Sequence, residues 1–344
     1  MRHTGFLISA AMIALTLGTN ACCNKQSCQG IPSDKKEIID RFLDGTLDPS
    51  YTPALFFGHF GGDQKLGEGA VQAHLNLFLK GGSDILKIQT EQPMPRVEDL
   101  SMDTLLVPED WYRPTLEVIK EVLSYVGKDV YVMPTILSTH QVARQGFGDD
   151  RLPVWAVERP EAYKRMLDSY TKAILWYIRA CKAAGVEAFF TATQGGEQKF
   201  YELDVPGGFF ETFIRPYDLE VMGEASKDTR FTILHICDWE GPMDDLTRYL
   251  DYPGKIVNVP LTIDGKPLSL TETFEFFGRP AGRLRPQGRD RQGLPGRDCC
   301  PYARDHCQRS PRAHDGRRRL LRPFTSQYYG QHPCCRQHGT WPLT

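Results

Sequence analysis

Residues 159–193 read RPEAYKRMLDSYTKAILWYIRACKAAGVEAFFTAT, and this stretch decides the fold. Apolar and aromatic side chains recur every three or four residues, which predicts an amphipathic helix over 159–184. Pro160 suits the first turn of this helix, and Gly185 suits the residue that follows it. The apolar run 187–193 then predicts a strand. A helix that leads directly into a short apolar strand is typical of a parallel sheet covered by helices.

The same alternation runs through residues 36–280. Further strands are predicted at 54–60, 85–90, 130–136, 231–237 and 256–260, and further helices at 68–80, 114–126, 209–225 and 243–250. Residues 61–63 read GGD, so no GxGxxG loop follows the first strand and a dinucleotide-binding sheet is disfavoured. Six strands before residue 260 favour an α/β fold of the TIM (β/α)8 barrel type, in one domain, over a doubly wound open sheet.

The composition is ordinary on average, with 24% charged residues, 41% hydrophobic residues and a formal net charge of −2. These values exclude a disordered, collagen-like or multi-span membrane chain. The charge is nevertheless divided unevenly. Residues 281–344 hold 13 Arg and 4 Asp, with no Lys or Glu, and five of the ten Cys. The tail is therefore strongly basic, whereas residues 1–280 are acidic.

The amino terminus has the order of a secretory signal. A basic start precedes a short apolar run and a small-residue stretch that ends at Cys22. We expect residues 1–22 to be a signal peptide of the lipoprotein type, with Cys22 as the lipidated residue and 23–35 as a polar tether. Plain cleavage after Ala21 is the alternative. Either way the chain is predicted to be exported, as a periplasmic protein or one attached to the membrane by its lipid. Export permits disulfides, but Cys181 lies inside an apolar helix and is predicted to be a free core residue.

The triplet His235-Ile236-Cys237 is the most informative candidate site. Residues two apart on a strand point to the same face, so the imidazole and the thiol would project together from the end of a strand. Both are good zinc ligands, although a catalytic zinc needs three protein ligands and one open position. A core histidine beside a buried free cysteine is the alternative interpretation.

Other polar residues follow predicted strands, where the chemistry of a barrel takes place. Glu91 and Asp238 are candidate catalytic residues, Glu91 as a general base and Asp238 as a group that orients a ligand. His59, Gln89 and Gln194 are candidate contacts for a small-molecule substrate. Each could instead be an ordinary packed or solvated residue.

Four segments, in order, resemble the superfamily of uroporphyrinogen decarboxylase and its zinc-dependent relatives, the corrinoid and coenzyme M methyltransferases. The segments are 81–88 (GGSDILKI), 183–187 (AAGVE), 208–221 (GFFETFIRPYDLEV) and 233–237 (ILHIC). The resemblance covers about residues 36–280 and implies a TIM barrel.

The superfamily contains two chemistries. Its decarboxylases use no metal and bind substrate carboxylates with arginines from an early motif, whereas residues 57–60 here read FGHF. In the methyltransferase branch, His-x-Cys and a later Cys hold the zinc that activates a thiol, and His235 and Cys237 match the first two ligands. The resemblance therefore implies zinc-dependent thiol or methyl transfer. The alternatives are a metal-free decarboxylase-like carboxy-lyase and a non-catalytic periplasmic binding barrel.

The basic tail, 281–344, is predicted to be translated out of frame. A shift of one nucleotide lets the codons of 282–289 encode GGFDRKGV and those of 331–341 encode NIRAAVNTAH, both of which fit the family's pattern. Leu320 and Leu321 would become codons that permit Cys, near the expected third zinc ligand. The alternative is a genuine basic tail that binds nucleic acid or zinc, but we expect no nucleic-acid partner. The chain as written should then lack the closing strand and helices, fold poorly and lack activity.

Overall fold

The computed structural model describes residues 35–91, 111–148, 151–283 and 325–328. The predicted signal peptide with Cys22, almost all of the tether and most of the basic tail lie outside these ranges. Within them, no helix combines the length and the apolar character needed to cross a membrane.

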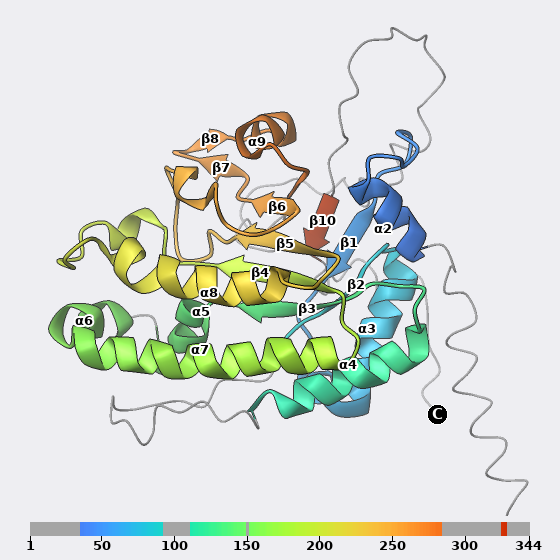
Figure 1. The fold of residues 1–344 in the computed structure, drawn as a ribbon, viewed down its shortest axis with the longest axis horizontal. Coiled ribbons are helices and arrows are strands. Elements are labelled where there is room, and N and C mark those ends of the chain that lie inside the picture. Colours follow the sequence, from blue (N-terminus) through green and yellow to red (C-terminus); the bar gives the residue numbers. More distant parts are fainter. Residues whose placement is uncertain (1–34, 92–110, 149–150, 284–324, 329–344) are drawn as a thin grey trace, which may run out of the picture.

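A parallel sheet forms the centre of the molecule (Figure 1). Six strands are hydrogen-bonded in the order β2 (Leu86–Ile88), β3 (Val132–Leu137), β4 (Ala188–Thr193), β5 (Phe231–Ile236), β6 (Ile256–Val259) and β9 (Ala281–Arg283). A separate parallel pair joins β1 (Ala54–Phe57) to β10 (Thr325–Tyr328). This pair lies against both edges of the sheet, because β1 contacts β2 and β10 contacts β9. The predicted α/β fold with a parallel sheet is confirmed. In the described residues no strand ladder joins the pair to the sheet, so closure of the barrel stays a prediction.

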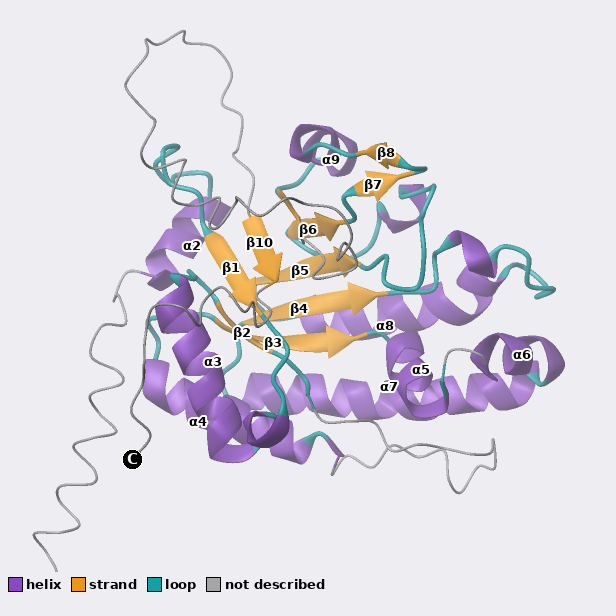
Figure 2. Cartoon of the chain, turned by 180° about the vertical axis from the view of Figure 1, so that it is seen from behind, coloured by secondary structure: helices purple, strands orange, loops and turns teal. Residues whose placement is uncertain are grey.

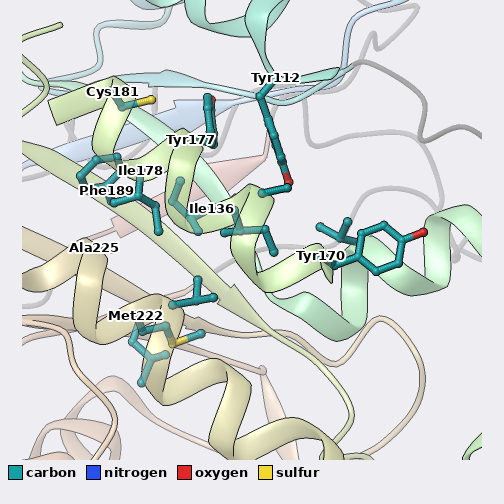
Figure 3. Close-up of a cluster of buried hydrophobic side chains, with 14 of the residues drawn as sticks. Tyr112, Ile136, Tyr170, Tyr177, Ile178, Cys181, Phe189, Met222 and Ala225 are labelled. Carbon is teal, nitrogen blue, oxygen red and sulfur yellow. The ribbon is translucent and has the colours of Figure 1, made fainter. Parts of the chain in front are cut away.

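Four long helices cover the outer face of the sheet (Figure 2). They are α3 (Gly67–Gly81), α4 (Arg113–Val126), α7 (Pro160–Ala183) and α8 (Arg215–Ser226), the last preceded by the π-helical turn η6 (Phe210–Ile214). In Figure 3, Tyr177, Ile178 and Cys181 of α7 lie among Ile136 of β3 and Phe189 of β4. Cys181 is a fully buried free thiol, which confirms the prediction that it is a core residue.

The inner face of the sheet carries a second apolar cluster that helix α2 (Lys35–Leu43) covers at the amino-terminal ends of the strands. Phe190 and Ile233 belong to this cluster, whereas their chain neighbours Phe189 and Leu234 belong to the outer one. Such alternation is what a strand buried on both faces requires. The carboxylate of Asp40 anchors α2, because it accepts hydrogen bonds from Arg230 and Tyr131, each at 2.7 Å.

The predicted helix at 243–250 is wrong. Only a short 3-10 turn, η7 (Thr247–Tyr249), forms there. The Asp245 carboxylate accepts hydrogen bonds from the Thr247 N–H at 2.7 Å and hydroxyl at 2.6 Å, a local pattern that competes with helix formation. Elements that the sequence interpretation did not include are α2, α5 (Thr139–Phe147), α6 (Arg151–Glu158), α9 (Leu270–Phe277) and the hairpin of β7 (Thr262–Ile263) with β8 (Lys266–Pro267).

Strands β9 and β10 both lie in the tail that was expected to lack a closing strand. This expectation fails for the backbone, because β10 pairs with β1 over four residues. Ladder hydrogen bonds join main-chain groups, which every non-proline residue carries. A four-residue pairing therefore says little about which side chains the tail should carry, and the frameshift remains a prediction.

Candidate active site

The candidate residues gather where β1, β2, β4 and β5 end. Because these strands are parallel, their carboxyl ends meet at one edge of the sheet. The loops that follow β4 and β5 contact each other there, since the Gln198 N–H donates to the Pro242 carbonyl at 3.1 Å. The fold thus brings Gln194, His235 and Cys237 to one place.

His235 lies near the carboxyl end of β5, and its side chain points inward. Its ring packs 5.3 Å from that of Phe190, and only 9% of the residue is exposed. Nδ1 is buried without a hydrogen-bond partner among the described residues. Burial, and then the nearby charge of Lys87, lower the pKa of His235 to about 4. The imidazole is therefore neutral at neutral pH, which is the form that binds metal ions.

Cys237 follows directly after β5. Its N–H donates to the Thr193 carbonyl at 3.1 Å, which continues the strand pairing by one residue. Its Sγ accepts a hydrogen bond from Nε2 of Gln194 at 3.2 Å. Burial raises the pKa of the thiol to about 11. Without a cation beside it, this thiol therefore remains protonated at neutral pH.

His235 and Cys237 offer a zinc ion two suitable donors, a neutral imidazole beside Asn258 and a soft sulfur. The described residues contain no group of three His, Cys, Asp or Glu side chains that could hold a metal ion. The donor set therefore fits zinc in kind but is one ligand short in this part of the chain.

Gln194 and Glu197 form a buried polar loop after β4. The Gly195 N–H donates to Oε2 of Glu197 at 2.7 Å. Oε1 of Gln194 and Oε1 of Glu197 are both buried without a partner in the described residues. Burial, and then the charge of Glu240, raise the pKa of Glu197 to about 7. The sequence interpretation missed Glu197, because nothing in a lone acidic residue after two glycines predicts its burial.

Glu91 and His59 lie together at the ends of β2 and β1. Nδ1 of His59 is 3.0 Å from Oε1 of Glu91, and the Phe60 N–H donates to the same oxygen at 3.1 Å. The Glu91 side chain is buried, whereas His59 is 59% exposed. Asp238, next to Cys237, is an exposed residue, although partial desolvation of its carboxylate raises its pKa. These are the two predicted catalytic carboxylates. Glu91 follows β2, and Asp238 follows β5.

The side-chain oxygen of Gln89 is occupied by hydrogen bonds within the protein. Its Oε1 accepts hydrogen bonds from the Lys87 ammonium and from Oγ1 of Thr135, the latter at 2.8 Å. The Lys87 Nζ also lies 3.9 Å from the ring centroid of Phe57 and 4.4 Å from that of Phe190. Burial lowers the pKa of Lys87 well below its usual value. Lys87 was missed, although the alternation Ile85, Lys87, Gln89 places it on the inner face.

A second buried cluster surrounds Glu240. Its carboxylate is 3.0 Å from Nε2 of His140 and accepts a hydrogen bond from Lys199 at 2.9 Å. Burial opposes ionisation, but the hydrogen bonds and charges of His140 and Lys199 lower the pKa of Glu240 to about 2. This cluster was also missed, because its members lie 41 and 100 residues apart in the chain.

Comparison with known proteins supports the fold. No family model matches the chain, and no curated protein matches it by sequence. A methyltransferase from Methanosarcina mazei is similar in structure, with a TM-score of 0.53 and 17% identity, over 73% of this chain and 82% of that one. A B12-independent methionine synthase from Shewanella sp. W3-18-1 gives a TM-score of 0.42 and 11% identity, over 68% of this chain and 80% of that one, too low to carry an argument. The chain therefore shares the parallel α/β fold of the methyltransferase.

Proposed function

We propose that this chain is a TIM-barrel enzyme of the uroporphyrinogen decarboxylase superfamily, of the type that transfers a methyl group to a thiol with the help of zinc. The observation that carries the proposal is the pair formed by His235, near the end of β5, and Cys237, directly after that strand at the carboxyl end of the sheet. The likeness to a methyltransferase fold supports it. A zinc ion bound there would act as a Lewis acid that lowers the pKa of a substrate thiol.

The residues of this chain have separate tasks in the proposal. His235 and Cys237 hold the metal ion, and the Gln194 amide fixes the sulfur by donating to it. Glu91, held by His59 and the Phe60 N–H, takes up the proton that the thiol releases. The third ligand would come from outside the described residues, near Leu320 and Leu321, where the other reading frame permits Cys.

The remaining proposals concern the ends of the chain. Residues 1–22 would direct export and Cys22 would carry a lipid, so that the barrel is held at a membrane surface. Labelling with a radioactive fatty acid tests this, and Cys22→Ala should abolish the label. Residues 281–344 would be the product of a shifted frame, which the nucleotide sequence of the gene decides.

The experiment measures bound zinc in the chain as written and in a version whose tail is restored to the other frame. We expect about one zinc per restored chain, and far less in the chain as written, because two ligands hold zinc weakly. His235→Ala and Cys237→Ala should release the metal, whereas Cys181→Ala, a buried cysteine outside the site, should retain it. A restored chain without zinc, or full retention in Cys237→Ala, contradicts the proposal.

Two other functions would be distinguished by further assays of activity and ligand-induced stability on the restored chain. A metal-free carboxy-lyase predicts activity that a chelator does not change. A non-catalytic binding barrel predicts that a ligand stabilises the chain without any product.

A further inference from the structure

A groove of about 510 Å³ lies between the loops that follow β4 and β5. This volume is in the usual range for a small-molecule site. Tyr201 is the exposed aromatic residue of its lining, with the buried rings of Phe200, Phe209 and Phe210 beneath, and the charged residues along the groove include Arg248. Both loops leave the carboxyl ends of strands, where the ligands of parallel α/β folds bind.

Arg248 is held in a fixed position inside this groove. Its guanidinium carbon lies 4.9 Å from the ring centroid of Tyr201 and 4.9 Å from that of Phe210. One of its N–H groups donates to the Tyr201 hydroxyl at 2.9 Å, and that hydroxyl donates to Asp244 at 2.6 Å. Two rings and one hydrogen bond thus restrict the rotamers of a long side chain before any ligand arrives. A preorganised guanidinium loses less entropy when it forms a two-bonded contact with a carboxylate.

The acidic residues at the groove already have partners. Asp245 directs one oxygen to the Thr247 N–H and hydroxyl, and its other oxygen is 3.8 Å from Arg248, too far for a hydrogen bond. Glu211 forms only a loose ion pair, 3.6 Å from Arg215, and its side chain is exposed to solvent. In the described residues, Tyr201 is the one side chain to which Arg248 donates a hydrogen bond. Its remaining donors are therefore suited to an anion.

The exposed aromatic residue in the groove indicates which kind of ligand should carry the anionic group. Tyr201 is 44% exposed although the Arg248 guanidinium lies over its ring, so part of its surface is open to a ligand. Flat rings stack on such a surface with an advantage beyond the area that they bury. We propose that this groove binds a small aromatic carboxylate, with its ring on Tyr201 and its carboxylate on the edge of the Arg248 guanidinium. The inference goes beyond the proposed function, because it needs neither zinc nor methyl transfer.

The test titrates the full chain with benzoate and measures binding by saturation-transfer NMR and calorimetry. Arg248→Gln should weaken binding roughly tenfold or more, because a charge-assisted hydrogen-bonded contact is lost. Arg248→Lys should also weaken it, since lysine keeps the charge but not the fork. Arg179→Gln is the matched control: Arg179 is an exposed arginine on α7 that pairs with Glu224 at 3.0 Å, and its loss should change nothing.

Three further measurements keep the proposal open to refutation. Cyclohexanecarboxylate should bind more weakly than benzoate, and Tyr201→Leu should remove that difference even if Arg248→Gln fails to fold. Benzyltrimethylammonium should bind less well than benzoate. Equal benzoate binding in Arg248→Gln, or a preference for the cation, overturns the proposal, as does the absence of benzoate binding at millimolar concentration. Because Cys237→Ala should leave benzoate binding intact, failure of the zinc proposal and failure of this one can be told apart.

Discussion

Replacing Asp84 should cost the fold several kcal/mol without touching the candidate site. Asp84 lies just before β2, at the amino-terminal ends of the strands, and is 1% exposed. Its carboxylate accepts hydrogen bonds from the Ala54 N–H at 2.7 Å, the Tyr51 hydroxyl at 2.7 Å and the Lys35 ammonium at 2.5 Å. One side chain thereby joins β1, β2 and α2.

The magnitude follows from the burial of this carboxylate and its partners. Removing one partner of a buried ion pair typically costs about 3–5 kcal/mol, and each hydrogen bond to a charged group contributes about 1.5–3 kcal/mol. These contributions overlap, so we expect Asp84→Ala to lower the free energy of unfolding by about 3–5 kcal/mol. Tyr51→Phe, which leaves the carboxylate its other partners, should lower it by about 1.5 kcal/mol.

Urea unfolding followed by circular dichroism measures these differences. The matched control is Glu117→Ala, because Glu117 also has a close lysine partner, Lys120 at 2.8 Å, but is 67% exposed. Its replacement should change the free energy of unfolding by less than about 0.5 kcal/mol. If Asp84→Ala costs no more than this control, Asp84 does not join the three elements and the reasoning fails.

Three other changes test the interior at the carboxyl end of the sheet. A Cβ at Gly196 would lie 1.9 Å from the Tyr249 hydroxyl, so Gly196→Ala should cost about 1–3 kcal/mol in urea unfolding, and Tyr249→Phe should recover part of this loss. Burial lowers the pKa of His74 from 6.5 to about 4, so protonation opposes folding: about 3 kcal/mol of stability should be lost as pH falls from 6.5 to 4, and a pH series on His74→Leu should lack this loss. Lys87→Met should raise the thermal midpoint at pH 7, because burial disfavours the ammonium, and the gain should shrink as pH rises toward 10.5, the ordinary pKa of lysine. An unchanged or lower midpoint would show that Lys87 stabilises the fold.

The long elements could be predicted because their periodicity is strong. Helix α7 was expected over 159–184 and forms at Pro160–Ala183, and the strand expected at 187–193 forms at Ala188–Thr193. The short helices were missed, although two carry a readable start signal. Ser138 with Gln141, and Ser269 with Glu272, form complete capping boxes. Their helices of nine and eight residues are too short for periodicity alone to reveal.

The candidate site was predictable where strand alternation applies and not where tertiary contacts decide. Alternation placed His235 and Cys237 on one face, and the structure puts the Gln194 amide on that sulfur. Glu197 and Arg248 were missed for a different reason. Their environments depend on how the loops after β4 and β5 pack, and the second loop was misread as a helix. The sequence of a loop shows neither the helical repeat of about 3.6 residues nor the two-residue alternation of a strand, and these are the patterns on which the sequence interpretation relies.

The ionisation states at the site constrain how a metal ion could bind there. Burial keeps the pKa of Cys237 near 11 and that of His235 near 4. At neutral pH the imidazole is therefore ready to coordinate, whereas the thiol must first lose its proton. Zinc binding should thus release one proton from Cys237 and none from His235, so Cys237 by itself should make the affinity rise about tenfold per pH unit above neutrality, and a third ligand that is also a thiol would add to this slope. A metal site made only of neutral donors would show no such slope, so the slope itself reports whether the sulfur is a ligand.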